Sequence, residues 1–342
     1  MSLLGFAALL ALPWLLPLVM PPGQAQFWTA NILGRAIVFG IVAMSLTFLA
    51  TYGGFISLAQ MMIAGIAGYA LAVCVDGAVP RIVGGFGYGA AIPLSLLAAT
   101  AMGLLVGAIS VRTRDIYLLM ITLALAMGVF RFVETNIAWF NGYEGIRNVV
   151  GPTLFGFDFR NALVFYHVAL ATAALLYCGI LYLVKTPFGL VLQGIRDNPR
   201  RVAALGYSVG LHRIAAFGVA GFIAGCGGVL STIYNIGISP GTIGLGATVN
   251  VLIMSVIGGL GHPVGAFIGS LIFTVFDTFA ASIYDRDRFN TLIGLVFLAI
   301  VLVSPDGAIG IGARIRRFLG APRRSLQPAS ASSIRTAEEE SP

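Results

Sequence analysis

The sequence consists of long apolar stretches separated by short polar or glycine- and proline-containing breaks, and this pattern restricts the folds open to the chain. Most of the stretches are near the roughly 20 residues that a helix needs to cross a bilayer. Hydrophobic residues make up 58% of the 342 residues and charged residues only 10%, which excludes a soluble globular protein. We therefore predict an all-α polytopic integral membrane protein with about ten membrane segments. The predicted segments are residues 3–20, 31–51, 54–75, 90–111, 116–138, 162–184, 214–236, 248–260, 264–283 and 290–304.

Two of these stretches and the C-terminus need separate interpretation. Residues 3–20 lack a basic start and a cleavage site of small residues, so we expect a retained first helix and no signal peptide. Residues 248–260 are too few for a full span and predict a half-helix or re-entrant piece. We expect a membrane domain over 1–312 and a tail over 313–342 that is basic and then rich in Ser, Ala and Pro, a composition typical of disorder. An inverted repeat of five plus five segments fits this count.

The distribution of Lys and Arg predicts the orientation of the chain. If the segments alternate across the membrane and the loop 185–213 is cytoplasmic, both termini are cytoplasmic too. Thirteen of the 20 Lys and Arg residues then lie inside, six lie outside, and Arg131 lies within a segment. This excess agrees with the positive-inside rule, so the net charge of +7 is mainly a topology signal and gives no reason to expect nucleic-acid binding. The outside set is Arg35, Arg81, Arg147, Arg160, Arg286 and Arg288.

The polar loop 185–213 contains the signals of a short helix. Asn198 is a favourable N-cap, Pro199 fits the first helical turn, and Gly206 can end the helix in a left-handed conformation. The sequence therefore predicts a helix of about two turns. Its charged side chains are expected to be Arg196, Asp197, Arg200 and Arg201. Two interpretations remain open: an ordinary cytoplasmic loop whose charge sets the topology, or a helix that a cytoplasmic partner binds.

Several motifs in this loop are spaced as in a known family of membrane proteins. Thr186-Pro187-Phe188-Gly189 opens the loop, Ile195-Arg196-Asp197-Asn198 precedes the short helix, and Ala203-Ala204-Leu205-Gly206 ends it. Val209 and the run Arg213-Ile214-Ala215-Ala216-Phe217 follow without a gap. In these motifs the chain resembles permease subunits of the LivM type, from ATP-driven importers of branched-chain amino acids. The resemblance extends over residues 31–312.

The resemblance implies that the chain is one subunit of an assembly in the bacterial inner membrane. The expected partners are a second, homologous permease of the LivH type, two ATPase subunits and a periplasmic solute-binding protein. The two permeases would enclose a path that opens alternately to each side, and the short helix would transmit the closure of the ATPase on ATP. The residues expected to couple the chain to the ATPase are Arg196, Asp197, Asn198, Pro199, Arg200, Arg201, Ala204, Leu205 and Gly206.

A glycine pair, Gly53 and Gly54, precedes the third apolar segment. Ser57 and Gln60 follow at a spacing of three, which on a helix would place two hydrogen-bonding groups on one face. Such groups are costly in lipid, so they should face other helices or a watery path. The stretch also resembles a glycine-containing element of the family that continues to Tyr69. We consider these five residues candidates for the substrate path, with plain interhelical hydrogen bonding as the alternative.

A second glycine-rich break lies between segments 248–260 and 264–283. Gly258, Gly259, Gly261 and Gly265 resemble the family's pattern here and are expected to form a hinge with a sharp reversal. His262 stands among them, but no second His or Cys lies at ligand spacing, so a metal site is not expected. We interpret His262 as a capping or surface residue of the turn.

Polar residues elsewhere suggest three further features. The outside loop before residue 162 contains a departure from the family's pattern at Asn141, Tyr143 and Glu144, which are candidates for docking the binding protein; an ordinary exterior loop is the alternative. Arg131 and Glu134 are three apart within a segment and are expected to pair with each other. Asp277 has no evident partner nearby in the sequence, and proton coupling is one hypothesis for it.

The chain lacks the motifs of an enzyme. It contains no phosphate-binding G-x-x-x-x-G-K-S/T sequence, no H-E-x-x-H and no Ser/His/Asp set, so ATP and Mg²⁺ are expected on a partner subunit. Cys74, Cys178 and Cys226 lie in apolar runs, so no disulfide framework is expected. The resemblance implies inward transport of branched-chain or related hydrophobic amino acids. Family members for urea, short amides or aromatic acids, and an ion-coupled carrier using Asp277, remain alternatives.

Overall fold

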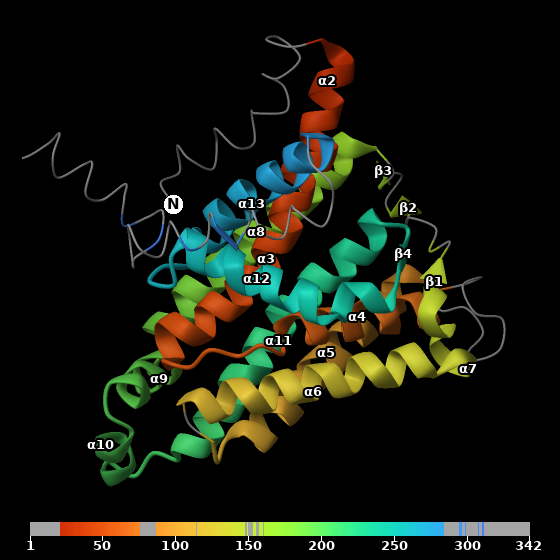
Figure 1. Cartoon of the computed structure of the whole chain (residues 1–342). Helices are drawn as coiled ribbons and strands as arrows, with labels where there is room; N and C mark the ends of the chain where they lie inside the picture. Colours follow the sequence, from red (N-terminus) through yellow and green to blue (C-terminus); the bar gives the residue numbers. More distant parts are fainter. Residues whose placement is uncertain are drawn as a thin grey trace, which may run out of the picture.

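The computed structural model describes residues 21–75, 87–113, 115–147, 149, 153–154, 157–159 and 161–283, together with five positions between 294 and 310. The predicted segment 3–20, most of the predicted segment 290–304 and the tail 313–342 lie outside the described residues. Nearly all of the described chain is helical (Figure 1). Two pairs of two-residue strands are the exceptions to the expected all-α fold.

Each of the eight predicted apolar stretches within the described residues contains a helix, although α4 begins six residues after the predicted start of its stretch. The α-helices are α2 Pro22–Phe27, α3 Arg35–Phe48, α4 Gln60–Cys74, α5 Tyr88–Ser110, α6 Asp115–Thr135, α7 Ile137–Phe140, α8 Ala162–Lys185, α9 Pro187–Asp197, α10 Pro199–Ala204, α11 Val209–Tyr234, α12 Leu245–Gly258 and α13 Pro263–Ile283. The π-helical turns η1 Trp28–Gly34 and η2 Leu49–Gly53 flank α3, and the 3-10 turns are η3 Gly142–Glu144 and η4 Pro240–Ile243. The strands are β1 Ile146–Arg147, β2 Thr153–Leu154, β3 Phe157–Asp158 and β4 Gly237–Ile238.

The described residues hold eight of the ten predicted membrane segments. Five of them form helices long and apolar enough to cross a membrane: Asn31–Gly53, Tyr88–Ser110, Ile116–Thr135, Ala162–Lys185 and Val209–Tyr234. Two more, α12 and α13, form a pair bent by 115°, which agrees with the half-helix predicted at 248–260. The eighth, α4, is a shorter apolar helix. The described part of the chain therefore contains five or six candidate spans, and the total of ten stays a prediction.

Small residues decide which helices form the interior. Most residues of α3 and α11 are buried, whereas at most about a third of those in α5, α6 and α8 are buried and the rest are half-buried or exposed. A Cβ at Gly103 of α5 would lie 2.5 Å from the carbonyl oxygen of Phe217 and 3.0 Å from the Cα of Gly221, so α5 and α11 touch through their backbones. Gly228 of α11 lies against the backbone of Ala64 in α4 in the same way. Close approach through glycine is how helices pack tightly in lipid.

The chain leaves the α3 helix at the predicted glycine pair. Gly54 has a left-handed φ of +73°, which a residue with a Cβ rarely adopts. Residues 55–57 continue without helical structure, and α4 begins only at Gln60. The spacing of three had suggested that Ser57 and Gln60 share a helical face. This prediction is wrong, because Ser57 precedes the helix.

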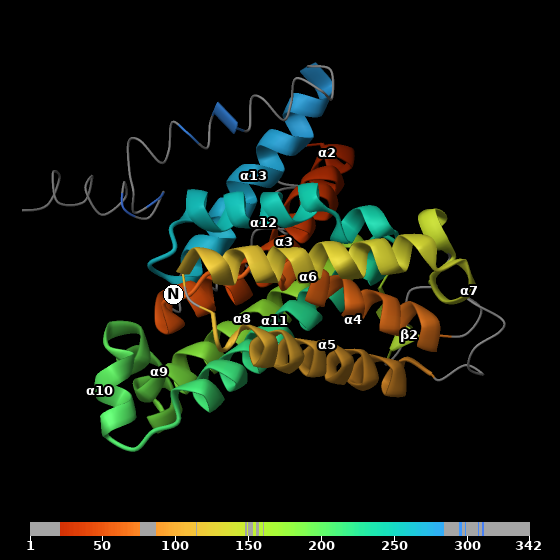
Figure 2. The ribbon, with the colours of Figure 1, turned by 60° about the horizontal axis from the view of Figure 1, so that its bottom comes forward.

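The two ends of the bundle differ in structure (Figures 1 and 2). Helices α9 and α10 project from one end, which we call the α9–α10 end. At the opposite end, the β1–β4 end, β1 pairs antiparallel with β4, with Ile146 opposite Ile238 and Arg147 opposite Gly237. Val111 in the turn after α5 packs near Gly210 at the start of α11, so the basic turn after α5 lies at the α9–α10 end. This grouping of basic residues agrees with the charge distribution of the sequence.

Candidate functional site

The short helix predicted in the polar loop is α10. The side-chain Oδ1 of Asn198 accepts a hydrogen bond of 3.1 Å from the backbone N–H of Arg201, as an N-cap does. Pro199 is the first helical residue, and Gly206 follows the helix with a left-handed φ of +89°. All three sequence signals are therefore confirmed. They are local, and a helix end depends mainly on local hydrogen bonds.

A separate helix, α9, precedes α10 and corrects the expected positions of two charged residues. Arg196 and Asp197 are the last residues of α9, so Arg196 does not share a face of α10 with Arg200 and Arg201, and Asp197 is not in the first turn of α10. The loop forms two helices because Asn198 has an extended backbone, with φ −157° and ψ 94°. Arg196 Nε instead contacts Asp197 Oδ1 at 3.1 Å.

Helix α9 is amphipathic, and its apolar face holds it against the bundle. Leu192 and Ile195 are buried, whereas the charged residues at its end are exposed. A Cβ at Gly189 would overlap the backbone of Leu183 and Val184, so the first turn of α9 folds back directly on the end of α8. The loop is therefore fixed to the bundle through α9.

Arg196 also links α9 to two other parts of the chain through Thr51. Arg196 Nη1 donates a hydrogen bond of 2.6 Å to the carbonyl oxygen of Thr51, which lies in η2. The hydroxyl of Thr51 donates to the carbonyl oxygen of Leu260, in the turn between α12 and α13. Gly54 leaves room for the stem of Arg196, since a Cβ there would overlap Arg196 Cγ. We call these three residues, Arg196, Thr51 and Leu260, the Thr51 junction.

Helix α10 exposes a continuous surface beyond the Thr51 junction. Val202 is buried against Gly194 of α9 and anchors the helix. Arg200, Arg201 and every residue from 203 to 208 are exposed, and the side chain of Leu205 is 76% exposed. The surface therefore combines two basic side chains with an apolar one at the tip of the molecule.

The predicted hinge glycines have three different environments. Gly258 and Gly265 lie against each other's backbone, so α12 and α13 touch where they diverge. Gly259 has a φ of +104°, which reverses the chain. A Cβ at Gly261 would meet nothing within 4 Å, so that position does not require glycine. His262 caps α13: its Nδ1 accepts a hydrogen bond of 3.3 Å from the backbone N–H of Val264, which confirms the capping interpretation.

Four of the five candidates for the substrate path, Gly53, Ser57, Gln60 and Tyr69, are buried within the bundle, whereas Gly54 is exposed. Gln60 Oε1 accepts a hydrogen bond of 3.0 Å from the hydroxyl of Ser45 in α3, which is the interhelical bonding considered as the alternative. Gln60 Nε2 and the hydroxyl of Tyr69 have no hydrogen-bond partner among the described residues. Ser57 is fully buried, and its hydroxyl accepts a hydrogen bond from the backbone N–H of Ala59. None of these residues lines the cavity found at the other end of the described chain, so their role in transport stays a prediction.

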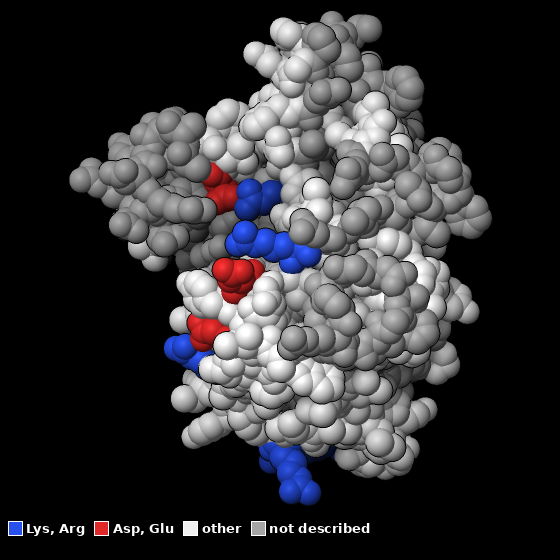
Figure 3. Space-filling view, turned by 90° about the vertical axis from the view of Figure 1, so that its right-hand side faces the viewer, with Lys and Arg blue, Asp and Glu red and all other residues white. Residues whose placement is uncertain are grey.

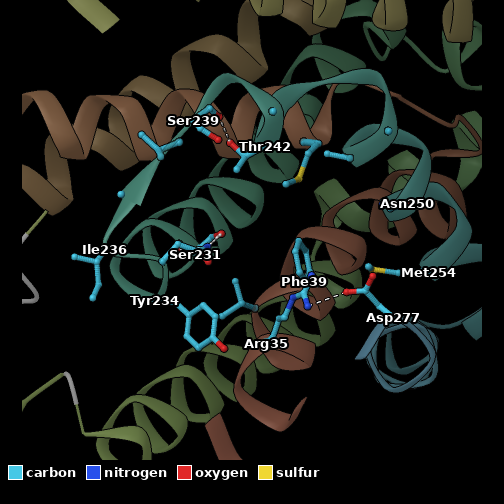
Figure 4. Close-up of a pocket in the computed structure, with 18 of the residues that line it drawn as sticks. Arg35, Phe39, Ser231, Tyr234, Ile236, Ser239, Thr242, Asn250, Met254 and Asp277 are labelled. Atoms are coloured by element: carbon cyan, nitrogen blue, oxygen red, sulfur yellow. Dashed lines mark hydrogen bonds and ion pairs between the residues drawn. The ribbon is translucent and has the colours of Figure 1, made fainter. Parts of the chain in front are cut away.

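That cavity, of about 660 Å³, lies at the β1–β4 end between α3, α11, α12 and α13 (Figure 4). Its wall contains an ion pair between Arg35 Nη1 and Asp277 Oδ2 at 2.8 Å. Asp277 therefore has a partner, although none is near it in sequence. The hydroxyl of Ser270 in α13 donates a hydrogen bond of 2.8 Å to the carbonyl oxygen of Ala36, so polar contacts join α3 and α13 at two points. The sequence did contain a signal for this partner: Arg35 belongs to the predicted outside set of arginines and has no Asp or Glu near it in the sequence.

The loop that was predicted to lie outside, with Asn141, Tyr143 and Glu144, forms part of the same end. Asn141 has a left-handed φ of +58°, and its Nδ2 donates a hydrogen bond of 2.9 Å to the carbonyl oxygen of Gly145. Tyr143 and Glu144 are exposed, and Glu144 lines the rim of the cavity. The loop then continues into β1. Nearby, Arg131 and Glu134 pair at 2.7 Å, as the sequence predicted.

The cysteines and the possible metal ligands were also considered in the sequence. Cys74, Cys178 and Cys226 are all free thiols. Within the described ranges, no group of three or more His, Cys, Asp or Glu side chains could hold a metal ion.

Comparison with known proteins decides the family. Over residues 28–303 the sequence matches the family described as the permease component of branched-chain amino acid transport systems. The chain belongs to this family. The matched region covers both the glycine break at residues 53–54 and the α9–α10 loop. It also covers the α12–α13 pair, so the three features singled out in the sequence all fall within it. No solved structure matches the chain.

Individual relatives of this permease family come from different transport systems. A probable branched-chain amino acid transport permease protein LivM of Methanocaldococcus jannaschii is 27% identical over 240 residues, which are 63% of this chain and 67% of that protein. The high-affinity branched-chain permease LivM of Escherichia coli K12 is 25% identical over 56% of this chain, and the match spans half of that protein's length. An autoinducer 2 import permease LsrC of Enterobacter sp. strain 638 is 27% identical over 70% of this chain and 68% of its own.

Proposed function

We propose that this chain is the membrane-spanning subunit of an ATP-driven importer and moves branched-chain or related hydrophobic amino acids inward by alternating access. The observation that carries the proposal is the geometry of the α9–α10 loop. Helix α10 presents Arg200, Arg201 and Leu205 outside the bundle, while α9 is bonded through the Thr51 junction to α3 and to the turn between α12 and α13. A motor subunit that bound α10 would thus act on the helices that line the cavity at the far end.

The proposal includes three kinds of partner. The ATPase subunits, which carry ATP and Mg²⁺, would seat α10 on the cytoplasmic side, and both termini would be cytoplasmic. The periplasmic binding protein would dock at the β1–β4 end, on Asn141, Tyr143 and Glu144. A second permease of the LivH type would complete the path, and a LivH of Methanocaldococcus jannaschii is itself 28% identical to this chain over 196 residues.

The order and direction of the helices support ten segments in two inverted halves. Helix α3 runs from the cavity to the α9–α10 end, then an irregular stretch leads to the short helix α4. Helix α11 runs from the α9–α10 end to the cavity, then β4 and the turn η4 lead to the short helix α12. In both cases a long buried helix is followed by a short apolar one, and the two long helices run in opposite directions, as in inverted halves.

Other solutes and another energy source are the competing proposals. The LsrC relatives carry autoinducer 2 in their names, and urea, short amides and aromatic acids also fit a family of this breadth. An ion-coupled carrier would need a free carboxylate, whereas Asp277 is paired with Arg35. Uptake into proteoliposomes that contain the complete transporter and internal ATP, without any ion gradient, separates the two energy sources, because only the ATP-driven importer works there.

The docking of the ATPase is tested by reversing the charge of α10. The double variant Arg200→Glu, Arg201→Glu should lose the ATPase on co-purification and should lose uptake. The double variant Arg200→Lys, Arg201→Lys keeps the charge and serves as the control. If the glutamate variant retains the ATPase and imports solute at the control rate, the proposed function of this loop is wrong.

A further inference from the structure

The cavity at the β1–β4 end combines opposite charges in equal number. Arg35 and Asp277 form the ion pair in its wall, and Glu144 and Arg147 lie at its rim. On the face that shows the β1–β4 end, basic and acidic side chains lie close together (Figure 3). Among the described residues, these four are the charged residues of the lining, so the cavity has no net charge to attract an anion or a cation alone.

The rest of the lining divides into a polar and an apolar part. Ser231, Thr242 and Asn250 supply hydrogen-bonding groups. Phe39, Met254 and Phe273 supply apolar surface next to the ion pair. Asn250 and Met254 are four apart on α12 and face the same space as Asp277 (Figure 4). A volume of about 660 Å³ is in the range of small-molecule sites.

The ion pair is accessible enough to exchange partners. The side chains of Arg35 and Asp277 are 38% and 25% exposed, so water screens their attraction and the pair contributes little net stability. Phe39 lies 5.5 Å below the guanidinium group and holds it in place. A ligand that brings both a carboxylate and an ammonium group could replace each partner without leaving any charge unpaired. A ligand with only one charge, or with none, could not.

We propose that this cavity is the outward-facing binding site of the solute and that it selects zwitterions. Arg35 binds the carboxylate of the solute, Asp277 binds its ammonium group, and Phe39, Met254 and Phe273 contact its apolar side chain. The proposal rests on the proposed function for its biological meaning, and it deepens that function by assigning the charged head group to two residues. The same assignment predicts that this chain does not bind an uncharged polar solute at this site.

Gly246 offers a place for a reporter thiol. It lines the cavity, and a Cβ there would meet nothing within 4 Å, so Gly246→Cys fits without displacing a neighbour. The variant is made in a chain whose native cysteines are replaced by alanine and is incorporated in the complete transporter. A membrane-impermeant, positively charged methanethiosulfonate then labels the thiol from outside. Leucine at millimolar concentration should protect the thiol, whereas 4-methylpentanoate, 3-methylbutylamine and ribose should not.

Substitution of the ion pair tests the assignment of the head group. With Asp277→Asn, half-protection should need about tenfold more leucine or higher still, because a charge-assisted hydrogen bond is lost. The swapped pair Arg35→Asp, Asp277→Arg retains an ion pair, but the positive and negative groups exchange places relative to Phe39, Met254 and Phe273. A purely structural role predicts that the swap restores protection, and a binding role predicts that it does not. If the Asp277→Asn variant does not accumulate in the membrane, protection by leucine is measured on the swapped pair alone.

The outcomes of these experiments distinguish a failure of the zwitterion site from a failure of the proposed function. Equal protection by leucine and ribose, protection that survives Asp277→Asn, or full restoration by the swapped pair would overturn the zwitterion site. None of these results touches ATP-driven uptake, which is measured on the same transporter. Conversely, protection by leucine does not depend on ATP, so it would persist even if the ATPase failed to act through α10.

Discussion

Arg196 Nη1 lies 2.6 Å from the carbonyl oxygen of Thr51 and donates a hydrogen bond to it, which ties the last turn of α9 to the end of the α3 helix. Carbonyl groups at a helix end lack intrahelical donors, so an arginine is a favourable partner there. Because the hydroxyl of Thr51 bonds to Leu260, a displacement of α9 acts on both α3 and the turn between α12 and α13. These are the helices that carry Arg35 and Asp277 at the other end.

Replacing Arg196 with glutamine removes this charge-assisted bond and leaves the surface of α10 intact. We expect Arg196→Gln to retain the ATPase on co-purification and to import severalfold less solute per ATP hydrolysed. The reason is that α9 is no longer bonded to α3. Arg112→Gln, an exposed residue in the turn after α5, is the matched control and should leave the ratio unchanged. An unchanged ratio in Arg196→Gln would show that the bond does not transmit motion.

The second bond of the Thr51 junction is tested separately. Thr51→Val removes the hydroxyl that donates to Leu260 but keeps the backbone carbonyl that Arg196 binds. We expect a lower transport rate with normal assembly, since α12 and α13 lose their bond to η2. Thr47→Val is the control, because the buried hydroxyl of Thr47 donates only to Ala43 within its own helix. Equal rates for the two valine variants would argue against the junction.

The positions of the helices could be predicted from the sequence, because span length and helix ends are set locally. The apolar stretches located the spans, and Asn198, Pro199 and Gly206 located α10. Helix α9 was missed because only one helix of about two turns was predicted in this loop, although Pro187 marks an earlier helix start and Leu192 and Ile195 give α9 an apolar face. That pattern was available in the sequence.

The tertiary contacts of the site could not be predicted in this way. The bond from Arg196 to Thr51 joins residues 145 positions apart, and the bond from Thr51 to Leu260 joins residues 209 apart. No spacing rule relates such positions, because they meet only after the helices have packed. Asp277 lacked a partner in the sequence for the same reason, and the cavity was missed because its lining comes from nine different helices, helical turns and strands.

The N-cap of α10 has a measurable role. Asn198→Ala removes the acceptor for the Arg201 N–H and should cost about 0.5–2 kcal/mol of helix stability. A helix of six residues has little stability of its own, so α10 should fray. We expect faster proteolysis after Arg200 or Arg201 in the isolated permease and weaker retention of the ATPase. Asn198→Ser preserves a capping oxygen and should behave as the parent chain; comparable proteolysis of the alanine and serine variants would contradict the role of the cap.

The hinge offers a comparison between two neighbouring glycines. Gly259→Ala places a Cβ at a φ of +104° and should lower stability by about 1–3 kcal/mol, since L side chains rarely adopt that conformation. Gly261→Ala adds a Cβ in open space and should change stability little. Thermal unfolding of the purified protein in detergent measures both. A similar melting temperature for the two variants would show that the reversal at Gly259 tolerates a side chain.

The crossing of α4 and α11 provides the test of the interior. A Cβ at Gly228 would overlap the carbonyl group of Ala64, so Gly228→Ala must push the two helices apart. Overpacking of this kind costs about 1–3 kcal/mol, and more where the obstacle is backbone. Gly179→Ala is the matched control, because Gly179 lies in α8 and a Cβ there meets nothing within 4 Å. We expect the yield of monodisperse protein on size-exclusion chromatography to fall for Gly228→Ala and to hold for Gly179→Ala. If both variants elute like the parent, α4 and α11 are not in backbone contact at this crossing.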